Sequence, residues 1–268
     1  MPLLGRDHLT RGQGPIMLFN KAFFTLADVP AIVVSALLLF TDRGPNLASA
    51  VFGDIDTLLT EPLAADRPFQ AWLIFGGITL YFLKVFFWSW TYSHSNTVGV
   101  GSAIFVALGY HLFVVLSICL AAYQANRMPT TWEIANGAAV FCIALLHETL
   151  ADRELADFKK RKTGGLLQYG YHSICRHPNY FFNTFSFPCI ALMSGSYPVF
   201  ALWVFVQVFW AHAQSGVALE TYMASKYGAE WESYCKSVPF FFPKFGDLIN
   251  VLIFKHVGVK STESTKMN

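Results

Sequence analysis

Long apolar runs alternate with shorter polar stretches along the whole chain. A helix that crosses the hydrocarbon core of a bilayer needs about 20 mainly apolar residues. We therefore expect crossing helices at residues 22–40, 70–92, 99–123, 132–150, 181–194 and 199–217. The pattern predicts an all-α protein, a polytopic transmembrane helical bundle of about six to seven spans.

Several of these runs contain ionisable residues, which are costly inside a membrane. Asp28 and Pro30 lie in the first run. We favour a capping or interfacial role for Asp28, and Pro30 would kink the helix or mark its true start. Lys84 in the second run could extend to the interface or form an ion pair within the bundle. The third run contains Tyr110 and His111 near its middle.

The stretches between the runs differ in charge. Residues 41–69 are acidic and are expected to form a loop, whereas residues 153–162 are amphipathic and mainly basic. Basic residues also precede the first run and follow the sixth. Because cytoplasmic loops carry an excess of Lys and Arg, these regions predict six crossings with both termini in the cytosol. Residues 248–259 are too short to span and are expected at the interface.

Composition supports a membrane protein and excludes several kinds of site. Charged residues make up 13% of the chain, against about 25% in an average soluble domain. The net charge of +2 indicates no nucleic-acid partner. The five cysteines form no CxxC pair, so neither a disulfide framework nor a metal site is expected. The GxGxxG, P-loop, HExxH and GxSxG motifs are absent, so any nucleotide must bind in a helical membrane cavity.

The most polar segment beside an apolar run is residues 164–183. It contains Arg176, whose planar guanidinium suits a phosphate or carboxylate, particularly near the start of a helix. Pro178 is well placed as an early helical residue. Asn179 could bind an amide such as nicotinamide or an adenine edge, and Tyr180 could stack or donate. A helix cap whose arginine binds lipid headgroups is the alternative, and both interpretations remain open.

Two flanking segments offer further candidate ligands. Glu148 and Asp152 are four residues apart, hence on one helical face, and could bind ribose hydroxyls, a ligand amine or nearby basic residues. Lys159 and Arg161 follow one to three turns later and could reach phosphates. The alternative for this segment is a solvated amphipathic helix at the membrane surface.

The segment at residues 219–245 is amphipathic and rich in aromatic residues. Glu220 and Tyr222 would line a cytosolic surface. The three- and four-residue steps between Tyr227, Trp231 and Tyr234 place these side chains on one helix face. Packing or an interfacial belt is the interpretation we favour for this aromatic face.

Two stretches resemble a known membrane superfamily. They are ADRELADFKKRKTGGLLQYGYHSICRHPNYFFN, at residues 151–183, and KYGAEWESYCKSVPFFFP, at residues 226–243. They are similar to the C-terminal half of a superfamily that includes steroid 5α-reductases, sterol Δ14 and Δ7 reductases, DUF1295 proteins and, more distantly, isoprenylcysteine carboxyl methyltransferases. The resemblance covers roughly residues 145–245 and is greatest to the DUF1295 group. It does not specify one reaction, because the reductase and methyltransferase branches share the RHPxY element.

The resemblance implies cofactor-binding residues for each branch. The reductase pattern would place NADPH against Asp152, Lys159 or Arg161, Arg176, Asn179, Tyr180 and Tyr222. The methyltransferase pattern would place S-adenosylmethionine against Tyr171, His172, Arg176, His177, Pro178 and Tyr180, with Glu220 near a carboxyl substrate. Two positions depart from the family pattern: Phe182 replaces a glycine, and Asn183 replaces an acidic residue. Asn183 keeps the hydrogen-bonding capacity and is counted among the cofactor-binding residues.

We therefore expect an enzyme, an NADPH-dependent membrane reductase that acts on a lipid or sterol-like enone or double bond. Its catalytic acid is unassigned among Tyr81, Tyr92 and Tyr110. The basic residues near 159–161 suit the 2′-phosphate of NADPH. The first alternative is an S-adenosylmethionine-dependent methyltransferase of a lipidated or amphipathic acceptor. The second, favoured by Phe182, is a non-catalytic membrane protein that binds lipid or serves as a scaffold.

The expected organisation is a single integral membrane domain over residues 1–268. Residues 1–144 would form the helices on the substrate side, and residues 145–245 the half that encloses a cofactor cavity at the cytosolic face. Residues 246–268 would form an interfacial segment and a polar tail. The partners implied are the bilayer and a lipid-soluble small molecule, and the resemblance implies the endoplasmic reticulum for a eukaryotic source. The sequence leaves the oligomeric state open.

Overall fold

The computed structural model describes residues 9–11, 15–53, 58–92, 96–98, 104–124, 128–161, 165–211 and 216–254. The first elements are β1 (Leu9–Arg11), α1 (Pro15–Ala27), α2 (Val29–Phe40), α3 (Arg43–Phe52), α4 (Leu63–Asp66), α5 (Pro68–Thr91), β2 (Asn96–Val98), the π-helix η1 (Phe105–His111) and α7 (Leu112–Ala121). The later ones are α8 (Thr131–Lys160), the 3-10 helix η2 (Gly170–Ser173), α9 (Pro178–Asn183), α10 (Ser186–Met193), α11 (Tyr197–Phe209), α12 (Val217–Tyr227), α13 (Ala229–Ser237) and α14 (Phe245–Phe254).

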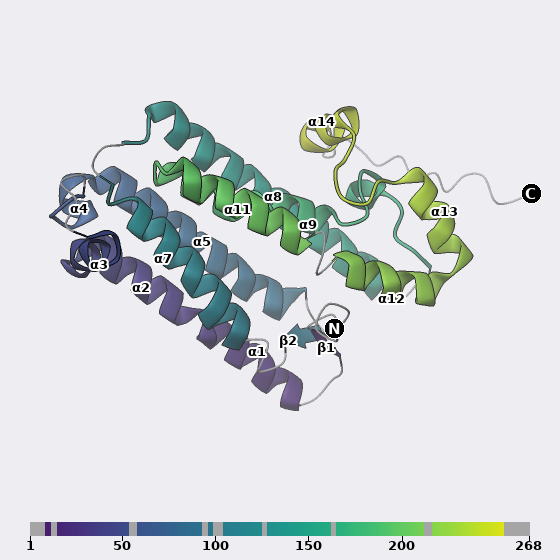
Figure 1. Ribbon diagram of the computed structural model, residues 1–268. Coiled ribbons are helices and arrows are strands. Elements are labelled where there is room, and N and C mark those ends of the chain that lie inside the picture. Colours follow the sequence, from purple (N-terminus) through teal and green to yellow (C-terminus); the bar gives the residue numbers. More distant parts are fainter. Residues whose placement is uncertain are drawn as a thin grey trace, which may run out of the picture.

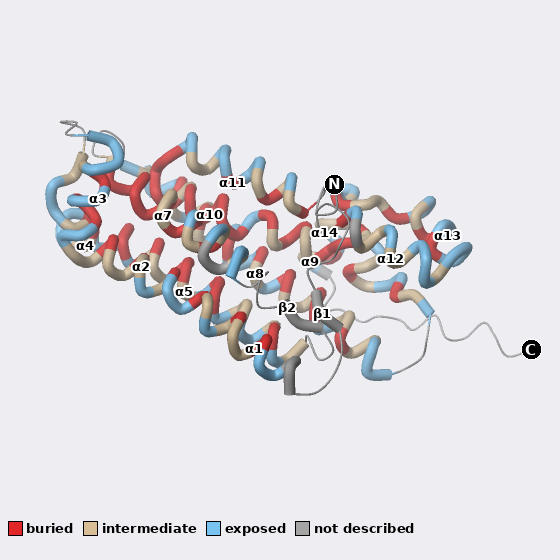
Figure 2. Tube along the Cα trace, turned by 60° about the horizontal axis from the view of Figure 1, so that its bottom comes forward, coloured by how far each residue is buried: buried red, intermediate tan, exposed pale blue. Residues whose placement is uncertain are grey.

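The described chain is predominantly helical, as expected, and its long helices form an elongated bundle (Figure 1). A short antiparallel ladder joins β1 to β2. Three helical segments are long and apolar enough to cross a membrane: Leu18–Phe40, Pro68–Thr91 and Thr131–Lys160. They fit a membrane-embedded protein and agree with the first, second and fourth expected spans. Exposed residues lie along the outer faces of the bundle (Figure 2), where a bilayer would contact them.

The remaining expected spans differ from the structure. The run at 99–123 contains η1 followed by α7, and its apolar helix extends over Gly109–Ala121. The run at 181–194 is divided between α9 and the eight-residue α10. At about 1.5 Å per residue, α10 is too short to cross a bilayer. The run at 199–217 contains the 13-residue α11. Six to seven spans therefore remain a prediction.

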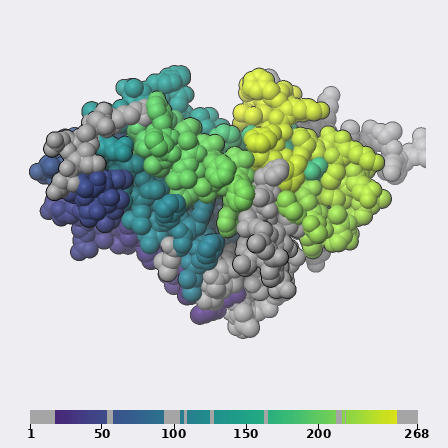
Figure 3. All heavy atoms as spheres, viewed as in Figure 1, coloured from purple at the N-terminus to yellow at the C-terminus, as the bar shows by residue number. Residues whose placement is uncertain are grey.

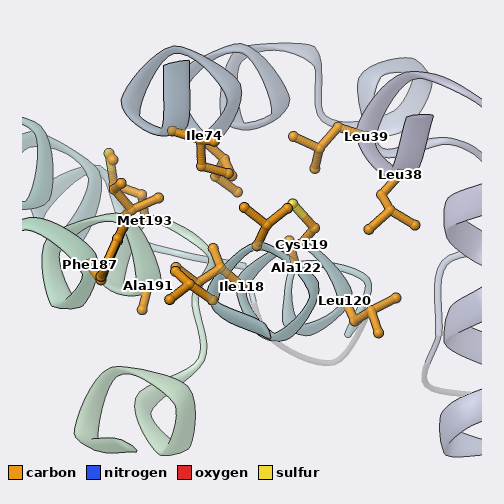
Figure 4. Packing of buried hydrophobic residues seen from close by; sticks show 14 of the residues in the cluster. Leu38, Leu39, Ile74, Ile118, Cys119, Leu120, Ala122, Phe187, Ala191 and Met193 are labelled. Atoms are coloured by element: carbon orange, nitrogen blue, oxygen red, sulfur yellow. The ribbon is translucent and has the colours of Figure 1, made fainter. Parts of the chain in front are cut away.

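The main hydrophobic core lies where α2, α5, α7 and α10 meet, as the side chains in Figure 4 show. Helix α10 is central to it, because nearly all of its residues are buried and it packs against α8, α11 and α5. The largest fully buried side chains include Trp203, Phe187 and Ile190. An apolar run of this kind predicts burial correctly, but it does not distinguish burial by protein from burial by lipid.

Helix α8 is a single 30-residue helix, although an apolar span and a separate basic segment were expected. Its start is fixed by a capping box, in which the Thr130 hydroxyl accepts a hydrogen bond from the Glu133 backbone and the Glu133 carboxylate accepts one from Thr130. The helix continues without interruption past residue 145, so both expected halves of the chain share it. The basic residues Lys159 and Lys160 lie in its last turn.

The segment at 41–69, expected to be a loop, contains α3 and α4. Tyr123 anchors α4 to the bundle: its hydroxyl donates to the Leu38 carbonyl of α2 and accepts from the Leu63 backbone N–H of α4 at 3.1 Å. Gly44 leaves the space for this ring, since a Cβ at that position would meet the tyrosine hydroxyl. A contact between residues so far apart in sequence gives no local signal.

The last helices form a lobe beside one end of the bundle (Figure 1), and the space-filling view shows a notch between the bundle and α14 on this face (Figure 3). Gly228, with φ of +51°, separates α12 from α13 and ends the single helix face expected for the aromatic residues. Trp231 and Tyr234 nevertheless pack together, with Tyr227 against them, so the packing interpretation is confirmed. Helix α14 covers the first part of the expected interfacial segment, and residues 255–268 lie outside the described residues.

Candidate functional site

Helices α8 and α9 are joined by two polar contacts, which we call the α8–α9 ladder. Asn179 Nδ2 donates to Asp152 Oδ1 at 3.1 Å. One turn further along α9, Asn183 Nδ2 lies 3.1 and 3.2 Å from the two oxygens of Glu148. Residues four apart on one helix therefore meet residues four apart on the other, with the chains antiparallel. The sequence predicts that Glu148 and Asp152 share a face, and the structure confirms it.

Lys84 of α5 completes the Glu148 end of the ladder. Its ammonium forms an ion pair with Glu148 Oε1, and the two side chains are only 10% and 7% exposed. Of the two roles expected for Lys84, the structure has the ion pair within the bundle. Buried charges are tolerated when they are paired and hydrogen-bonded, and Glu148 meets both conditions through Lys84 and Asn183.

Tyr81 lies one turn before Lys84 on α5 and is buried. Its hydroxyl interacts with the Asn183 side chain and with the charge of Glu148. The other two candidate acids are placed differently. Tyr110 donates its hydroxyl to Gln207 Oε1 at 2.5 Å, and Tyr92 lies at the C-terminal end of α5. Of the three tyrosines, Tyr81 therefore has the position that a proton donor beside the ladder requires.

A second polar group, the Arg176 clamp, lies at the start of α9. Arg176 Nε donates to Glu220 Oε1 at 3.0 Å, and His177 Nε2 lies 2.8 Å from the same oxygen. The Arg176 guanidinium also donates to the carbonyls of Cys235 and Val238. The clamp thus fastens α12 and the end of α13 to the start of α9. Pro178 is at the first turn of that helix, as the sequence predicts.

Replacing Arg176 by alanine should lower the free energy of unfolding by about 2–3 kcal/mol, because it removes a largely buried ion pair and leaves two carbonyls without their donor. The matched control is Arg161→Ala, at an exposed position just after α8. Thermal unfolding of the two purified variants in detergent would measure the difference. Equal stability of both variants would show that the clamp does not secure this lobe.

The segment around η2 is fixed by α8. The Tyr171 backbone N–H donates to Glu154 Oε2 at 2.8 Å, and the His147 ring lies 2.8 Å from the Tyr171 hydroxyl. Burial raises the pKa of Tyr171 to about 12, so this hydroxyl is protonated at neutral pH. His172 is adjacent, with its Nδ1 3.8 Å from Glu154. Contacts from α8 therefore position Tyr171 and His172, which precede Arg176 in the sequence.

Phe182 fills a packed position. It is 3% exposed, and its ring is stacked on His147 with centroids 5.3 Å apart. It also meets Tyr171 edge to face. The phenyl ring that replaces a glycine of the family pattern is therefore part of the core beneath the ladder, where it occupies the volume between α8 and η2.

Phe182→Leu should reduce the free energy of unfolding by about 1–1.5 kcal/mol, since a non-isosteric hydrophobic change in a packed site loses the aromatic contacts. Phe185→Leu, less than one turn later and 38% exposed, is the control and should change stability by less than about 0.5 kcal/mol. Denaturant titration of both variants tests this. A loss at Phe185 as large as at Phe182 would contradict the assignment of Phe182 to the core.

The other expected cofactor residues are spread around these two groups. The Tyr180 ring is stacked on His177 with centroids 5.7 Å apart. Lys159 and Arg161 are exposed at the C-terminal end of α8. Tyr222 lies on α12 with the Lys226 ammonium 5.8 Å from its ring. Lys162 and Gly164 lie outside the described residues. The described residues contain no cluster of three or more His, Cys, Asp or Glu side chains that could hold a metal.

One buried pair was missed by the sequence interpretation. Asp28 Oδ1 lies 2.7 Å from His111 Nδ1, and both side chains are almost fully buried. Asp28 occupies the N-cap position of α2 but makes no side-chain capping hydrogen bond. The capping or interfacial role favoured for Asp28 is therefore wrong: the residue faces the bundle interior, where an imidazole supplies its partner. The sequence did contain a signal for this pair, namely one ionisable residue in each of two apolar runs.

The comparisons with known proteins identify one family. Residues 90–238, more than half of the chain, match the family described as "Protein of unknown function (DUF1295)". This range includes the α8–α9 ladder, the Arg176 clamp and η2. No curated protein matches the chain significantly.

Proposed function

The chain belongs to the DUF1295 family, and on that basis and the geometry of its polar groups we propose that it is an NADPH-dependent membrane reductase of a lipid-soluble enone or activated double bond. The observation that carries the proposal is the α8–α9 ladder with Lys84 and Tyr81 at its Glu148 end. Ionisable residues inside a membrane-spanning bundle are expensive, and those that are retained usually serve a function.

The Asp152 end of the ladder fits a nucleotide. A carboxylate and a carboxamide in contact, as Asp152 and Asn179 are, can exchange their mutual hydrogen bond for bonds to ribose hydroxyls and to an amide. Lys159 lies seven residues further along α8, a distance of about 10 Å in a helix. Together with Arg161 it can meet a phosphate, and the 2′-phosphate of NADPH makes the fullest use of this basic end.

The Glu148 end of the ladder suits the transfer of a hydride and a proton to the substrate. NADPH, when bound, supplies a hydride to an electron-poor carbon. Tyr81 supplies the proton, and Asn183 and the Lys84–Glu148 pair hold its hydroxyl in a polar, water-poor setting. The apolar residues around Tyr81, including Phe82 and Phe187, suit a substrate that enters from the bilayer.

A different observation favours the second candidate, an S-adenosylmethionine-dependent methyltransferase. Arg176, His177 and Glu220 form one cluster, with Tyr180 stacked on His177. The methyltransferase pattern expects Arg176, His177 and Tyr180 at the cofactor and Glu220 near a carboxyl substrate. In the structure, however, the Arg176 guanidinium is engaged by Glu220 and two carbonyls. A cofactor carboxylate would have to replace those contacts.

Ligand-induced stabilisation tests the proposal. Purified full-length protein should be stabilised by NADPH more than by NADH or S-adenosylmethionine, by about 2.7 kcal/mol at a concentration 100 times the Kd. Asp152→Asn should reduce this stabilisation, whereas Asp157→Asn, an exposed change on the same helix, should preserve it. Stabilisation by S-adenosylmethionine alone would overturn the reductase in favour of the methyltransferase. No response to any of the three would favour a non-catalytic membrane protein.

Arg176→Ala is a poor probe of cofactor binding. The variant is expected to loosen the lobe that contains α12 and α13, so a lost ligand response would not separate the site from the fold. Asp152→Asn keeps the shape of the side chain and leaves the clamp intact, and it is therefore the variant of choice.

A further inference from the structure

The Asp28–His111 pair lies outside the ladder and has no part in the proposed cofactor site. Asp28 is at the junction of α1 and α2, and His111 is the last residue of the π-helix η1. Their side chains are 6% and 4% exposed, with Nδ1 and Oδ1 2.7 Å apart. Single-turn π-helical segments often occur at functional sites. Burying a carboxylate–imidazole pair inside an apolar bundle costs free energy, and ionisable residues that are retained there usually serve a function.

The surroundings of His111 join this pair to the reaction centre. The Tyr81 ring lies edge-on to the His111 ring with centroids 6.0 Å apart, and the charge of Asp28 also acts on Tyr81. The described residues show no direct hydrogen bond between the phenol and the imidazole, and with the rings this close one bridging water can connect them. Among the described residues, the imidazole is hydrogen-bonded to Asp28 through Nδ1, so Nε2 is the ring nitrogen that can exchange a proton with another group.

The other titratable groups on elements around His111 are few. Tyr110 precedes it, and its hydroxyl is committed to Gln207. Helix α1 contributes Lys21, α5 contributes Tyr81 and Lys84, and α8 contributes Glu148, which is paired with Lys84. Helix α2 has no titratable side chain, and the titratable groups of α7 and α10 are the thiols Cys119 and Cys189. Within the described residues, Asp28 is therefore the carboxylate that contacts the His111 imidazole.

We propose that Asp28 and His111 form a proton relay that restores the hydroxyl of Tyr81 after each turnover. Both are positioning residues, because they act through Tyr81. Asp28 holds the Nδ1–H, which fixes the tautomer and leaves Nε2 for the exchange with the phenol, by the logic of a carboxylate–imidazole–hydroxyl triad. The inference rests on the proposed function for the reaction it serves, but the chain Asp28–His111–Tyr81 can be observed without it.

In the reduction the substrate gains a hydride from NADPH and a proton from Tyr81, whose O–H bond breaks and leaves a phenolate. The Nε2–H bond of the His111 imidazolium then breaks and a new O–H bond forms on Tyr81. His111 is left neutral, with its Nδ1–H still donated to Asp28, and a proton from water restores the imidazolium. The electrons come from NADPH, and the net proton comes from solvent.

The test measures the imidazole directly, in full-length protein in lipid nanodiscs with ¹⁵N-labelled histidine. The His111 signals are those that His111→Gln removes. Tyr81→Phe, which removes one oxygen and keeps the ring, should displace the Nε2 signal and leave the Nδ1 signal. Asp28→Asn should displace the Nδ1 signal. Tyr110→Phe is the matched control: its ring lies 5.5 Å from the same imidazole, but its hydroxyl donates to Gln207, so Nε2 should not respond.

An Nε2 signal that ignores Tyr81→Phe, or that responds equally to Tyr110→Phe, would overturn the relay. If Tyr81→Phe does not fold, tyrosine labelled with ¹³C at Cζ reads the same contact from the other side, and His111→Gln must then displace the Tyr81 signal. Neither measurement contains NADPH. If the Nε2 signal responds to Tyr81→Phe but NADPH does not stabilise the protein, the proposed cofactor is wrong and the relay is retained. If NADPH stabilises the protein but the Nε2 signal does not respond, the relay alone is wrong.

Discussion

Replacing Lys84 by methionine is expected to lower the free energy of unfolding by about 3–5 kcal/mol, since removal of one partner leaves a buried charge uncompensated. Glu148 would keep its contacts with Asn183 but would have to remain charged without a cation or bind a proton. Glu148→Gln should be destabilising for the complementary reason. Denaturant or thermal unfolding of each variant in the same detergent gives the comparison.

The double variant decides whether the pair acts as a unit. Lys84→Met combined with Glu148→Gln removes both charges, so its loss should be smaller than the sum of the single losses, by about 0.5–3 kcal/mol. The pair Arg153–Asp157 on the same helix is the control: these side chains are 66% and 44% exposed, and Arg153→Ala should cost at most about 1 kcal/mol. Additive losses at Lys84 and Glu148 would mean that the two charges are not coupled.

The second large effect is expected on catalysis. Tyr81→Phe should slow the NADPH-dependent reduction of a lipid-soluble cyclohexenone with an alkyl chain by about 10²–10⁴-fold, the usual contribution of a positioned proton donor. The variant keeps the ring contacts with Phe187 and His111, so fold and NADPH-induced stabilisation should be preserved. The measurement is the rate of NADPH oxidation together with the thermal shift.

Two other tyrosines provide the controls for this prediction. Tyr92→Phe changes a residue at the end of α5, and Tyr110→Phe removes a hydroxyl that donates to Gln207. Both should reduce the rate much less than Tyr81→Phe. A Tyr81→Phe enzyme of normal rate, or a Tyr110→Phe enzyme as slow as the Tyr81 variant is expected to be, would assign the proton to another group.

The sequence predicts the elements whose signals are local. The apolar run at 70–92 became α5 with nearly the same bounds, and Pro30 and Pro178 mark the starts of α2 and α9. The spacing of Glu148 and Asp152 correctly placed both carboxylates on one face. These predictions succeed because helix length, proline geometry and helical periodicity are properties of neighbouring residues.

The predictions that failed or stayed open depend on distant partners. Asp28 looks like a cap until His111, 83 residues away, is folded against it. The run at 181–194 looks like a span, but nearly all residues of α10 are buried against other helices of the bundle. Lys84 and Glu148 are 64 residues apart, so the sequence could suggest an ion pair for Lys84 without naming its partner. In each case tertiary packing decided between interpretations that local pattern could not separate.

The most direct measurement of the central claim asks which cofactor transfers an atom to a lipid. Full-length protein in nanodiscs containing a natural lipid extract would be incubated with NADPH deuterated at C4 and S-adenosylmethionine with a deuterated methyl group, and the lipids analysed by mass spectrometry. A reductase should yield a lipid that has gained one deuterium and one hydrogen, and Tyr81→Phe should lose this product. A lipid that gains the deuterated methyl group, with no deuterium from NADPH, would contradict the account.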